Sequence, residues 1–401
     1  MVRIGVVVDA GQLMVSCDGY ARVWRRGSGE EPLLLGPNLH LRCLPSRMAP
    51  AVWASTAGQK TVPEWGVALS ELGAGRLGIY AEELLIEPVS ENEPIRVEGK
   101  AYRGEVLVLV PRPERLTAIN VLHIEDYLRG VVPPEVGRNP NLPAAVLRAQ
   151  AIAARSYTLF YMGRHEKLGF DLMATPVDQV YEGYGAETPE ADAAIAATRG
   201  MVAVYQGHPI RANYSSTCGG RTEASGRVWP GESFPYLRSI HDRVAGSGDL
   251  CEASPHHRWT ETWDCRELHG LILDHLAVED PRAANNPPTR IHDLEIEKRS
   301  ASGRAERLAI RTDTGTYHVH GDRIRWILQR PRGLGPLRST LIRDPRRSGA
   351  SERCTITIEG AGYGHGVGLC QTGAIELARR GRSAPEILHH YYRGIDLVRW
   401  W

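Results

Sequence analysis

Residues 142–157 read LPAAVLRAQAIAARSY, and this stretch decides the fold of the central part of the chain. Its apolar residues recur at helical spacing, and no proline or glycine interrupts them after the first turn. Asn141 is a suitable N-cap, and Pro143 is tolerated in a first turn. Because alanine lets a neighbouring element approach closely, the pattern predicts one continuous helix over 142–162, buried against a β-region at 201–214.

A glutamate lies just upstream of this helix, in the stretch VVPPEV at residues 131–136. Two prolines restrict the backbone there, so we expect Glu135 on a stiff, proline-bracketed turn. A rigidly held carboxyl beside a buried helix suits general acid/base chemistry, in which partial burial helps to keep the group protonated near neutral pH. A solvated turn glutamate is the alternative, and these residues alone favour it.

The segments around the helix are mainly β in pattern. From residue 1 to about 112, short apolar runs alternate and are separated by turn residues. Later runs at Leu308–Thr312 and Thr316–His320 predict a hairpin, and shorter helices are expected at 189–199 and 372–380. The fold class is therefore α+β. Its predicted parts are 1–112 (β-rich), 113–251 and 351–401 (two parts of one lobe) and 252–350 (a β-rich insert).

Composition excludes several classes of function. The 401-residue chain is 42% hydrophobic, with a formal net charge of +1, so nothing electrostatic favours nucleic acid or an anionic membrane as partner. No run of 18 apolar residues encodes a membrane span. The first residues, 1–9, alternate like a strand and lack the pattern of a signal peptide. For an exported protein, this leaves open whether a leader was removed, the start site is misplaced, or export itself is the wrong expectation.

Four blocks in order resemble the SpoIID/LytB family, the stage II sporulation protein D type of peptidoglycan enzyme. The family pattern has an acidic turn, a helix K-A-Q-A-x-A-A-R-[ST]-Y, then S-T-x-G-G-x-T and a late G-x-G-H-G-x-G-x-x-Q-x-G-A. The blocks here are the Glu135 turn, the helix at 142–157, NYSSTCGGRTE at 213–223 and GAGYGHGVGLCQTGA at 360–374. The resemblance runs from about Glu125 to the C-terminus and implies a further helix at 384–392.

The resemblance implies a lytic transglycosylase acting on peptidoglycan glycan strands in the cell envelope, secreted or periplasmic. Such an enzyme uses one carboxyl, here Glu135, first as acid and then as base, and the C6 hydroxyl of the sugar replaces water. A two-carboxylate glycosidase would need a second acid, and the blocks contain only Glu223 and the distant Glu376. A non-catalytic, glycan-binding modulator of a cell-wall amidase is the alternative. Candidates for a second acid outside the blocks are Asp171, Asp178 and Glu182.

The glycine-rich blocks supply the expected substrate-binding residues. Their hydroxyls, amides and side-chain-free backbone suit close approach to a sugar ring. A turn that satisfies its own backbone is the plain alternative for the first block, and the second lacks the lysine of a phosphate-binding loop. We expect Glu135 to face the loops 215–220 and 362–371 across one cleft. The predicted substrate-binding residues are Ser215, Thr217, Gly219, Gly220, His365 and Gln371.

Seven cysteines form no CxxC pair, which argues against a zinc ribbon. Some family members carry a Cys/His zinc site after the helix, but Val177 and Asp178 stand at those positions, so no metal or other cofactor is expected. A Cys218–Cys251 disulfide over the sugar-facing loop is a hypothesis that an oxidising compartment would allow. A thiol hydrolase using Cys218 or Cys370 with His365 is a further alternative.

Overall fold

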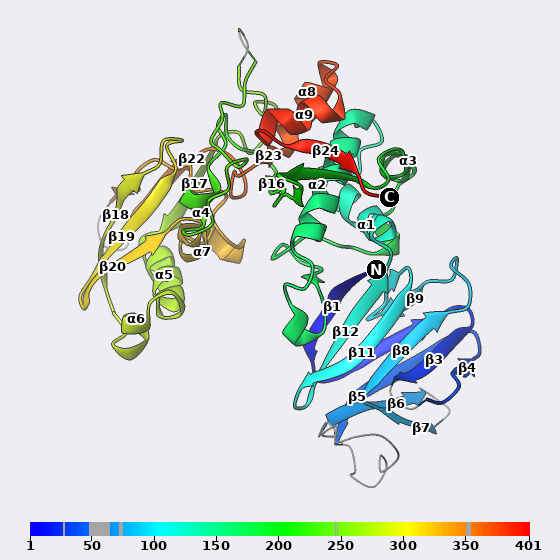
Figure 1. Cartoon of the computed structure of the whole chain (residues 1–401). Coiled ribbons are helices and arrows are strands. Elements are labelled where there is room, and N and C mark those ends of the chain that lie inside the picture. Colours follow the sequence, from blue (N-terminus) through cyan, green and yellow to red (C-terminus); the bar gives the residue numbers. More distant parts are fainter. Residues whose placement is uncertain (27–28, 48–64, 72–74, 245, 247, 350–353) are drawn as a thin grey trace. The chain divides into compact units, whose positions relative to one another are not determined.

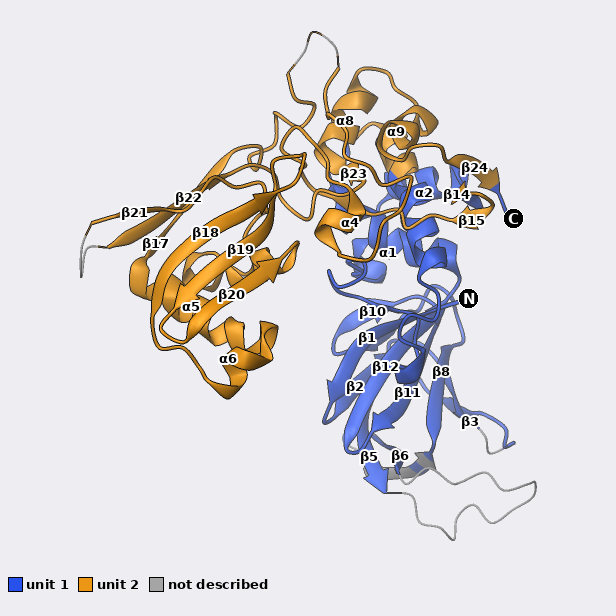
Figure 2. Cartoon of the chain, turned by 60° about the vertical axis from the view of Figure 1, so that its left-hand side comes forward, with its two compact units in different colours: residues 1–141, 150–202, 399–401 blue, residues 142–149, 203–398 orange. Residues whose placement is uncertain are grey.

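The computed structural model describes residues 1–401 except 27–28, 48–64, 72–74, 245, 247 and 350–353 (Figure 1). It confirms the predicted α+β class, with helices and several separate sheets. The chain folds into two compact units, coloured separately in Figure 2. Unit 1 comprises 1–141, 150–202 and 399–401, and unit 2 comprises 142–149 and 203–398.

Unit 1 begins with two sheets, which confirm the β-rich pattern of the N-terminal region. Their strand orders are β13-β1-β12-β11-β8-β3-β4 and β10-β9-β2-β5-β6-β7. The β-region continues past the predicted boundary at residue 112, because β12 pairs with both β1 and β11. The strands are β1 Val2–Ala10, β2 Leu13–Cys17, β3 Ala21–Arg26, β4 Leu33–Leu35, β5 Leu39–Arg47, β6 Trp65–Glu71, β7 Gly75–Ala81, β8 Glu83–Pro88, β9 Ile95–Val97, β10 Lys100–Tyr102, β11 Glu105–Arg112, β12 Arg115–Leu122 and β13 Leu172–Met173.

The two sheets lie against each other, with β11 beside β6 and β12 beside β5. The strands alternate buried and more exposed residues, as their sequence period requires. At the sheet edge, β13 pairs with β1 in parallel, and the ring of Phe170 lies 2.9 Å from where a Cβ on Gly5 would be. A glycine is therefore needed at position 5, where the segment after α2 closes over the sheet.

The α-helices in the described part of unit 1 are α1 Ile124–Val136, the greater part of α2 Ala144–Phe160, and α3 Pro189–Ala197. The predicted helix at 142–162 is one unbroken helix, slightly shorter at both ends. Its alanine stripe is buried, as predicted. The first residue of the predicted β-region contacts it within unit 1, since Nη1 of Arg155 donates to the carbonyl oxygen of Met201 at 3.1 Å. Residues 203–214 belong to unit 2.

Among the described residues, unit 2 holds helices α4 to α9 and the remaining small sheets, of which β14 and β24 extend into unit 1. The predicted hairpin is confirmed as β19–β20, and the predicted helices at 372–380 and 384–392 are α8 and α9. The strands are β14 Met201–Tyr205, β15 His208–Pro209, β16 Tyr214–Ser215, β17 Trp259–Asp264, β18 Ile291–Arg299, β19 Ala305–Thr312, β20 Gly315–His320, β21 Arg346–Ser348, β22 Thr355–Gly360, β23 Leu369–Cys370 and β24 Asp396–Arg399. The helices are α4 Ser225–Val228, α5 Cys265–Glu279, α6 Pro281–Asn285, α7 Arg323–Ile327, α8 Gln371–Arg379 and α9 Ala384–Tyr391.

The insert at 252–350 is less purely β than predicted, because α5 packs on its strands. The sequence carried the signal: Asp264 caps the helix by accepting from a backbone N–H, and Leu268, Ile272 and Leu276 recur four residues apart and are fully buried. A disulfide joins Cys265, at the start of α5, to a cysteine just before β22. None of the helices in the described part of the chain has the length and apolar character that a membrane crossing requires.

Candidate active site

Glu135 lies in the last turn of α1, which corrects the prediction of a proline-bracketed turn. Two prolines fit inside this helix because they stand near its end. Proline has no N–H, so Pro134 cannot bond to the carbonyl of Gly130 one turn earlier. That carbonyl instead accepts from the N–H of Glu182 at 3.1 Å. The helix then ends at Gly137, which has a φ of 94°.

The carboxylate of Glu135 is half-buried, and its Oε1 accepts from the backbone N–H of Val180 at 2.9 Å. The segment that supplies this N–H is itself fixed from within unit 1. Oε1 of Gln179 accepts from the hydroxyls of Thr158 (2.9 Å) and Tyr127 (3.3 Å). The hydroxyl of Tyr181 donates to Asn120 at 2.7 Å. Glu135 is thus positioned by a loop that buried hydrogen bonds hold in place.

The two tyrosines in this network stay neutral. Burial raises the pKa of Tyr127 well above its usual value, and the nearby charges of Asp178 and Glu135 raise it further. Burial likewise raises the pKa of Tyr181. Both phenols therefore act as hydrogen-bond donors that order the 179–181 loop.

Two of the candidate second acids are occupied by structural contacts. Asp171 is buried and accepts from the backbone N–H groups of Arg3 (2.8 Å) and Gly163 (3.0 Å). Asp178, at a position of the family's zinc site, accepts from His165 and from the N–H of Met173, both at 2.8 Å, and pairs with an arginine. Each fixes a loop of unit 1.

The other acids are also engaged. Glu182 forms a surface ion pair with Arg138. Glu223 is buried in unit 2, where it accepts from the N–H of Ala224 at 2.8 Å and from the hydroxyl of Ser302 at 2.6 Å. Glu376 pairs with an arginine one helical turn away.

The arginine of the helix block forms a buried ion pair. Nε and Nη2 of Arg155 donate to the two carboxylate oxygens of Glu125 at 3.1 and 2.6 Å. The same carboxylate accepts from the N–H of Gly200 and from the indole of Trp401, both at 3.1 Å. This pair joins α1, α2 and the chain end 399–401 of unit 1, so the arginine has a structural role.

In unit 2 the two glycine-rich blocks lie side by side, as the prediction of a shared surface requires. β16 and β23 pair in parallel through Tyr214↔Leu369 and Ser215↔Cys370. Beyond them, Thr217 and Tyr363 exchange backbone hydrogen bonds of 3.1 and 2.8 Å. The expectation that Glu135 faces these loops stays a prediction, because it concerns residues of both units.

Three buried polar atoms in these blocks have no hydrogen-bond partner among the described residues. They are Oγ of Ser215, Nε2 of Gln371 and Oδ1 of Asn213. A buried polar group without a partner costs free energy, and one reason for such a group in a folded protein is a ligand that completes it. Two of the three are predicted substrate-binding residues; Asn213 stood in the quoted block but had no assigned role.

The other residues of the first block have structural duties. Oγ1 of Thr217 is fully buried and 2.8 Å from Oγ of Ser254. Gly220 leaves room for Asp249, whose carboxylate lies 2.2 Å from where a Cβ would be. Gly219 has a φ of 77° and lines a cavity. Gly220 thus has a structural reason to be glycine, and its contact with sugar stays a prediction.

His365 is half-buried and stacks on Trp229, with ring centroids 5.0 Å apart. Its Nδ1 accepts from the N–H of Val367 at 3.0 Å. Burial lowers the pKa of His365 to about 4, so the ring is neutral at physiological pH and can donate through Nε2. On Trp229 the guanidinium of Arg211 lies 4.3 Å from the ring centroid, which is a cation–π distance.

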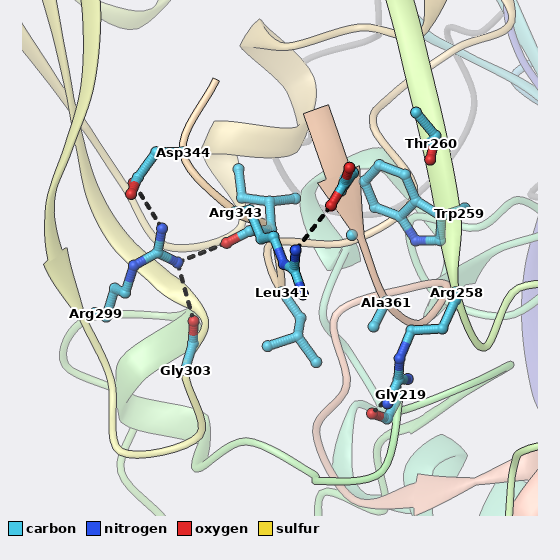
Figure 3. Close-up of a pocket in the computed structure, with 13 residues that line it drawn as sticks. Gly219, Arg258, Trp259, Thr260, Arg299, Gly303, Leu341, Arg343, Asp344 and Ala361 are labelled. Atoms are coloured by element: carbon cyan, nitrogen blue, oxygen red, sulfur yellow. Dashed lines mark hydrogen bonds and ion pairs between the residues drawn. The ribbon is translucent and has the colours of Figure 1, made fainter. Parts of the chain in front are cut away.

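A cavity of about 870 Å³ opens beside Gly219 in unit 2 (Figure 3). Arginines line it: Arg299 is paired to Asp344 at 2.7 Å, and Arg343 is paired to a glutamate. Arg258 donates to the carbonyl of Gly219 at 3.3 Å. Sequence reasoning missed this surface, although the polar and aromatic run SPHHRW at 254–259 was a signal for it.

The predicted Cys218–Cys251 disulfide is wrong, since their sulfurs are 3.8 Å apart and both cysteines are free. Burial raises the pKa of the thiols of Cys218 and Cys370. Buried, protonated thiols are poor nucleophiles, which argues against a thiol hydrolase that uses either of them.

Comparisons with known proteins identify relatives of this chain. The family model described as Stage II sporulation protein (SpoIID) matches residues 112–205, and one described as a domain of unknown function (DUF8618) matches 251–368. An uncharacterised protein of Brachyspira hyodysenteriae is 30% identical over 82% of this chain and 79% of its own length. The amidase enhancer of Bacillus subtilis is 29% identical over 88% of this chain and 53% of its own length. Stage II sporulation protein D of Bacillus amyloliquefaciens is 27% identical over 70% and 75%.

Proposed function

The chain belongs to the SpoIID/LytB family, and from this premise we propose that it cleaves the glycan strands of peptidoglycan as a lytic transglycosylase. The family acts at the cell envelope, which is where we propose that this chain works. The observation that carries the proposal is the carboxylate of Glu135, fixed at the end of α1 by the N–H of Val180. The two other acids of the matched blocks, Glu223 and Glu376, are held by contacts within their own surroundings.

In the proposed reaction Glu135 first donates its proton to the glycosidic oxygen, and the bond from that oxygen to C1 of the muramoyl residue breaks. The resulting carboxylate then accepts the proton of the C6 hydroxyl of the same residue. The C6 oxygen attacks C1, and a 1,6-anhydro ring closes. One carboxyl thus serves both steps, and no water is consumed.

The contacts of the other acids favour this one-carboxyl scheme. Asp171, Asp178 and Glu223 each accept two or more hydrogen bonds that fix local structure. A hydrolase of the two-carboxylate type would need a second carboxyl free to activate water or attack the sugar. These residues cannot take that role without breaking the contacts that position them.

Substrate binding is assigned to unit 2. Oγ of Ser215, Nε2 of Gln371 and Oδ1 of Asn213 offer donors and acceptors for sugar hydroxyl and N-acetyl groups. The neutral ring of His365, in the same glycine-rich block as Gln371, adds a further donor. Thr217 and Gly219 shape the loop that carries Ser215.

Mass spectrometry of sacculi digested by the full chain tests the proposal. Anhydro-muramoyl ends are the expected product. Reducing muramoyl ends would instead indicate hydrolysis, and released stem peptides would indicate an amidase or peptidase; either result as the main product would refute the proposal. Digestion of both intact and peptide-stripped glycan in parallel shows whether denuded strands are required.

A second candidate function is a non-catalytic, glycan-binding modulator of a cell-wall amidase. The relative named amidase enhancer favours it, although this chain spans about half the length of that protein. The two functions separate in one assay. A modulator releases nothing from sacculi alone but accelerates peptide release when an amidase is added, and its effect does not depend on the carboxyl of Glu135.

A further inference from the structure

Three thiols and a carboxylate converge in the interior of unit 2. Cys218 follows β16, Cys370 ends β23, and Asp242 and Cys251 lie before β17. All four side chains are buried, and their ligand atoms lie within 4.8 Å of one another. The proposed reaction uses none of these groups.

The spacing of the sulfurs does not suit a disulfide. Sγ of Cys218 lies 3.8 Å from Sγ of Cys251, whereas a disulfide needs about 2.05 Å. A disulfide between any two of the sulfurs would also leave the third thiol and the buried carboxylate unexplained. Tetrahedral zinc with Zn–S bonds of about 2.3 Å separates two ligand sulfurs by about 3.8 Å. The distance between the sulfurs of Cys218 and Cys251 therefore matches that between two thiolate ligands of a tetrahedral zinc ion.

The buried carboxylate also calls for a cation. Asp242 is fully buried, yet no lysine or arginine among the described residues forms an ion pair with it. Its Oδ2 lies 3.0 Å from Sγ of Cys218. Burying a carboxylate away from lysine and arginine costs free energy unless another positive charge compensates. A divalent ion at the centre of the four ligands supplies that charge.

Surrounding groups orient the four ligands in the manner of a metal site. Oδ1 of Asp242 accepts from the hydroxyl of Tyr391 at 2.8 Å and lies 3.3 Å from Nε2 of His390. Sγ of Cys370 accepts from the N–H groups of Cys218 (3.2 Å) and Gly373 (3.4 Å). Hydrogen bonds of this kind to ligating carboxylates are the usual second layer of a metal site.

We propose that Cys218, Asp242, Cys251 and Cys370 bind one zinc ion, which joins the 215–220 loop, the residues next to Asp242 and Cys251, and the start of α8. Thiolates select zinc over magnesium or calcium, which take oxygen ligands, and an all-cysteine set would be expected for an iron–sulfur cluster. Four protein ligands leave no open position, so the ion is structural. Binding releases the thiol protons to solvent. The proposal departs from the sequence-based expectation that the chain holds no metal, which rested on Val177 and Asp178 at another place in the chain.

The test begins with the zinc content of the full chain, purified without added metal or chelator. We expect about one zinc per chain. The Cys218→Ser/Cys370→Ser variant should retain less than about a tenth of it, because two of four ligands are lost. Cys17→Ser is the matched control, since Cys17 is a buried free cysteine of unit 1 whose thiol bonds to a backbone carbonyl. It should keep its zinc.

A second measurement uses only the parent protein, so it tests the proposal even if the cysteine variants fail to fold. Cobalt added to metal-stripped parent protein should give a thiolate-to-cobalt charge-transfer band and the visible spectrum of a tetrahedral ion. The proposal is overturned if the parent holds no zinc and shows no such band. It is also overturned if Cys17→Ser loses zinc as the double variant does, or if the mass of the native protein shows Cys218 disulfide-bonded to Cys251. Metal content is independent of wall cleavage, so this test stands whether or not the chain is a transglycosylase.

Discussion

The matched blocks of the two units differ in what their polar groups do. In unit 1 Arg155 bonds to Glu125 and Gln179 to Thr158, although both amide atoms of Gln150 in the helix block are buried without a partner among the described residues. In unit 2, Oγ of Ser215 and Nε2 of Gln371 are likewise buried without a partner in the described part of the chain. What distinguishes unit 1 is the carboxylate of Glu135, which a loop fixed by buried hydrogen bonds holds in place. What distinguishes unit 2 is that its unpartnered atoms lie in two glycine-rich blocks that pair with each other. On this difference we propose that unit 1 supplies the chemistry and unit 2 the substrate binding.

The largest effect should come from Glu135→Gln. The amide keeps the size of the side chain but cannot deliver a proton, so cleavage of sacculi should fall roughly 10²–10⁴-fold while glycan binding survives. Release of soluble muropeptides and co-sedimentation with sacculi measure the two properties. Glu182→Gln, a surface acid paired with Arg138, is the control and should cleave at close to the parental rate. A Glu135→Gln protein as active as the parent would place the chemistry elsewhere.

Removing one partner of the buried pair in unit 1 should cost stability. Arg155→Met leaves the carboxylate of Glu125 buried without its guanidinium, which costs about 3–5 kcal/mol. Urea unfolding followed by circular dichroism reports the loss. The double variant Arg155→Met/Glu125→Gln should recover much of it, because no buried charge is left uncompensated. If Arg155→Met is as stable as the parent, the block is not the structural support that the comparison assumes.

In unit 2 the lowered pKa of His365 predicts that the free energy of unfolding depends on pH. The pKa of the folded state, about 4, is below the ordinary value of 6.5. Above pH 6.5 the ring is neutral in both states and contributes nothing. As the pH falls from 6.5 to 4 the unfolded state takes up a proton that the folded state refuses, so stability falls by about 1–3 kcal/mol. His365→Gln should flatten this part of the profile, and His208→Gln, at an exposed histidine, should not.

The smallest stability effect separates two hydroxyls of one loop. Ser215→Ala removes an oxygen without a partner, so the free energy of unfolding should stay the same or rise, while glycan affinity falls about 2–10-fold for one lost hydrogen bond. Thr217→Val removes a hydroxyl that bonds to Ser254, so it should cost about 1 kcal/mol of stability. Isothermal titration with a glycan fragment and thermal unfolding give both numbers. If the two variants changed stability and glycan affinity equally, the argument that Oγ of Ser215 binds glycan would fail.

Local sequence signals predicted the parts of the fold that depend on local structure. The helix α2 followed from unbroken spacing, and the hairpin β19–β20 from alternation. Glu135 was placed on a turn because Pro133 and Pro134 normally end a helix. The helix continues because the carbonyl of Gly130, which Pro134 leaves without a helical partner, accepts from the N–H of Glu182. That partner is distant along the chain, so the sequence did not reveal it.

The sites of unit 2 depend on contacts that spacing cannot show. The sequence suggested that Cys218 and Cys251 are close, which is correct, but not that Cys370 and Asp242 complete the group. Asp242 had no motif around it, and only the fold brings it to the sulfurs. The partners of Thr217 and Glu223 are likewise distant in sequence, so their structural roles could not be separated from substrate binding in advance.

The central claim, that one carboxyl cleaves glycan without water, is tested most directly by digesting sacculi in water labelled with heavy oxygen. The account predicts new muramoyl ends that carry no label and are lighter than reducing ends by one water, formed by the parent and not by Glu135→Gln. Label incorporated at C1 of the new ends, at the rate of cleavage, would show that water attacks the sugar and would contradict the account.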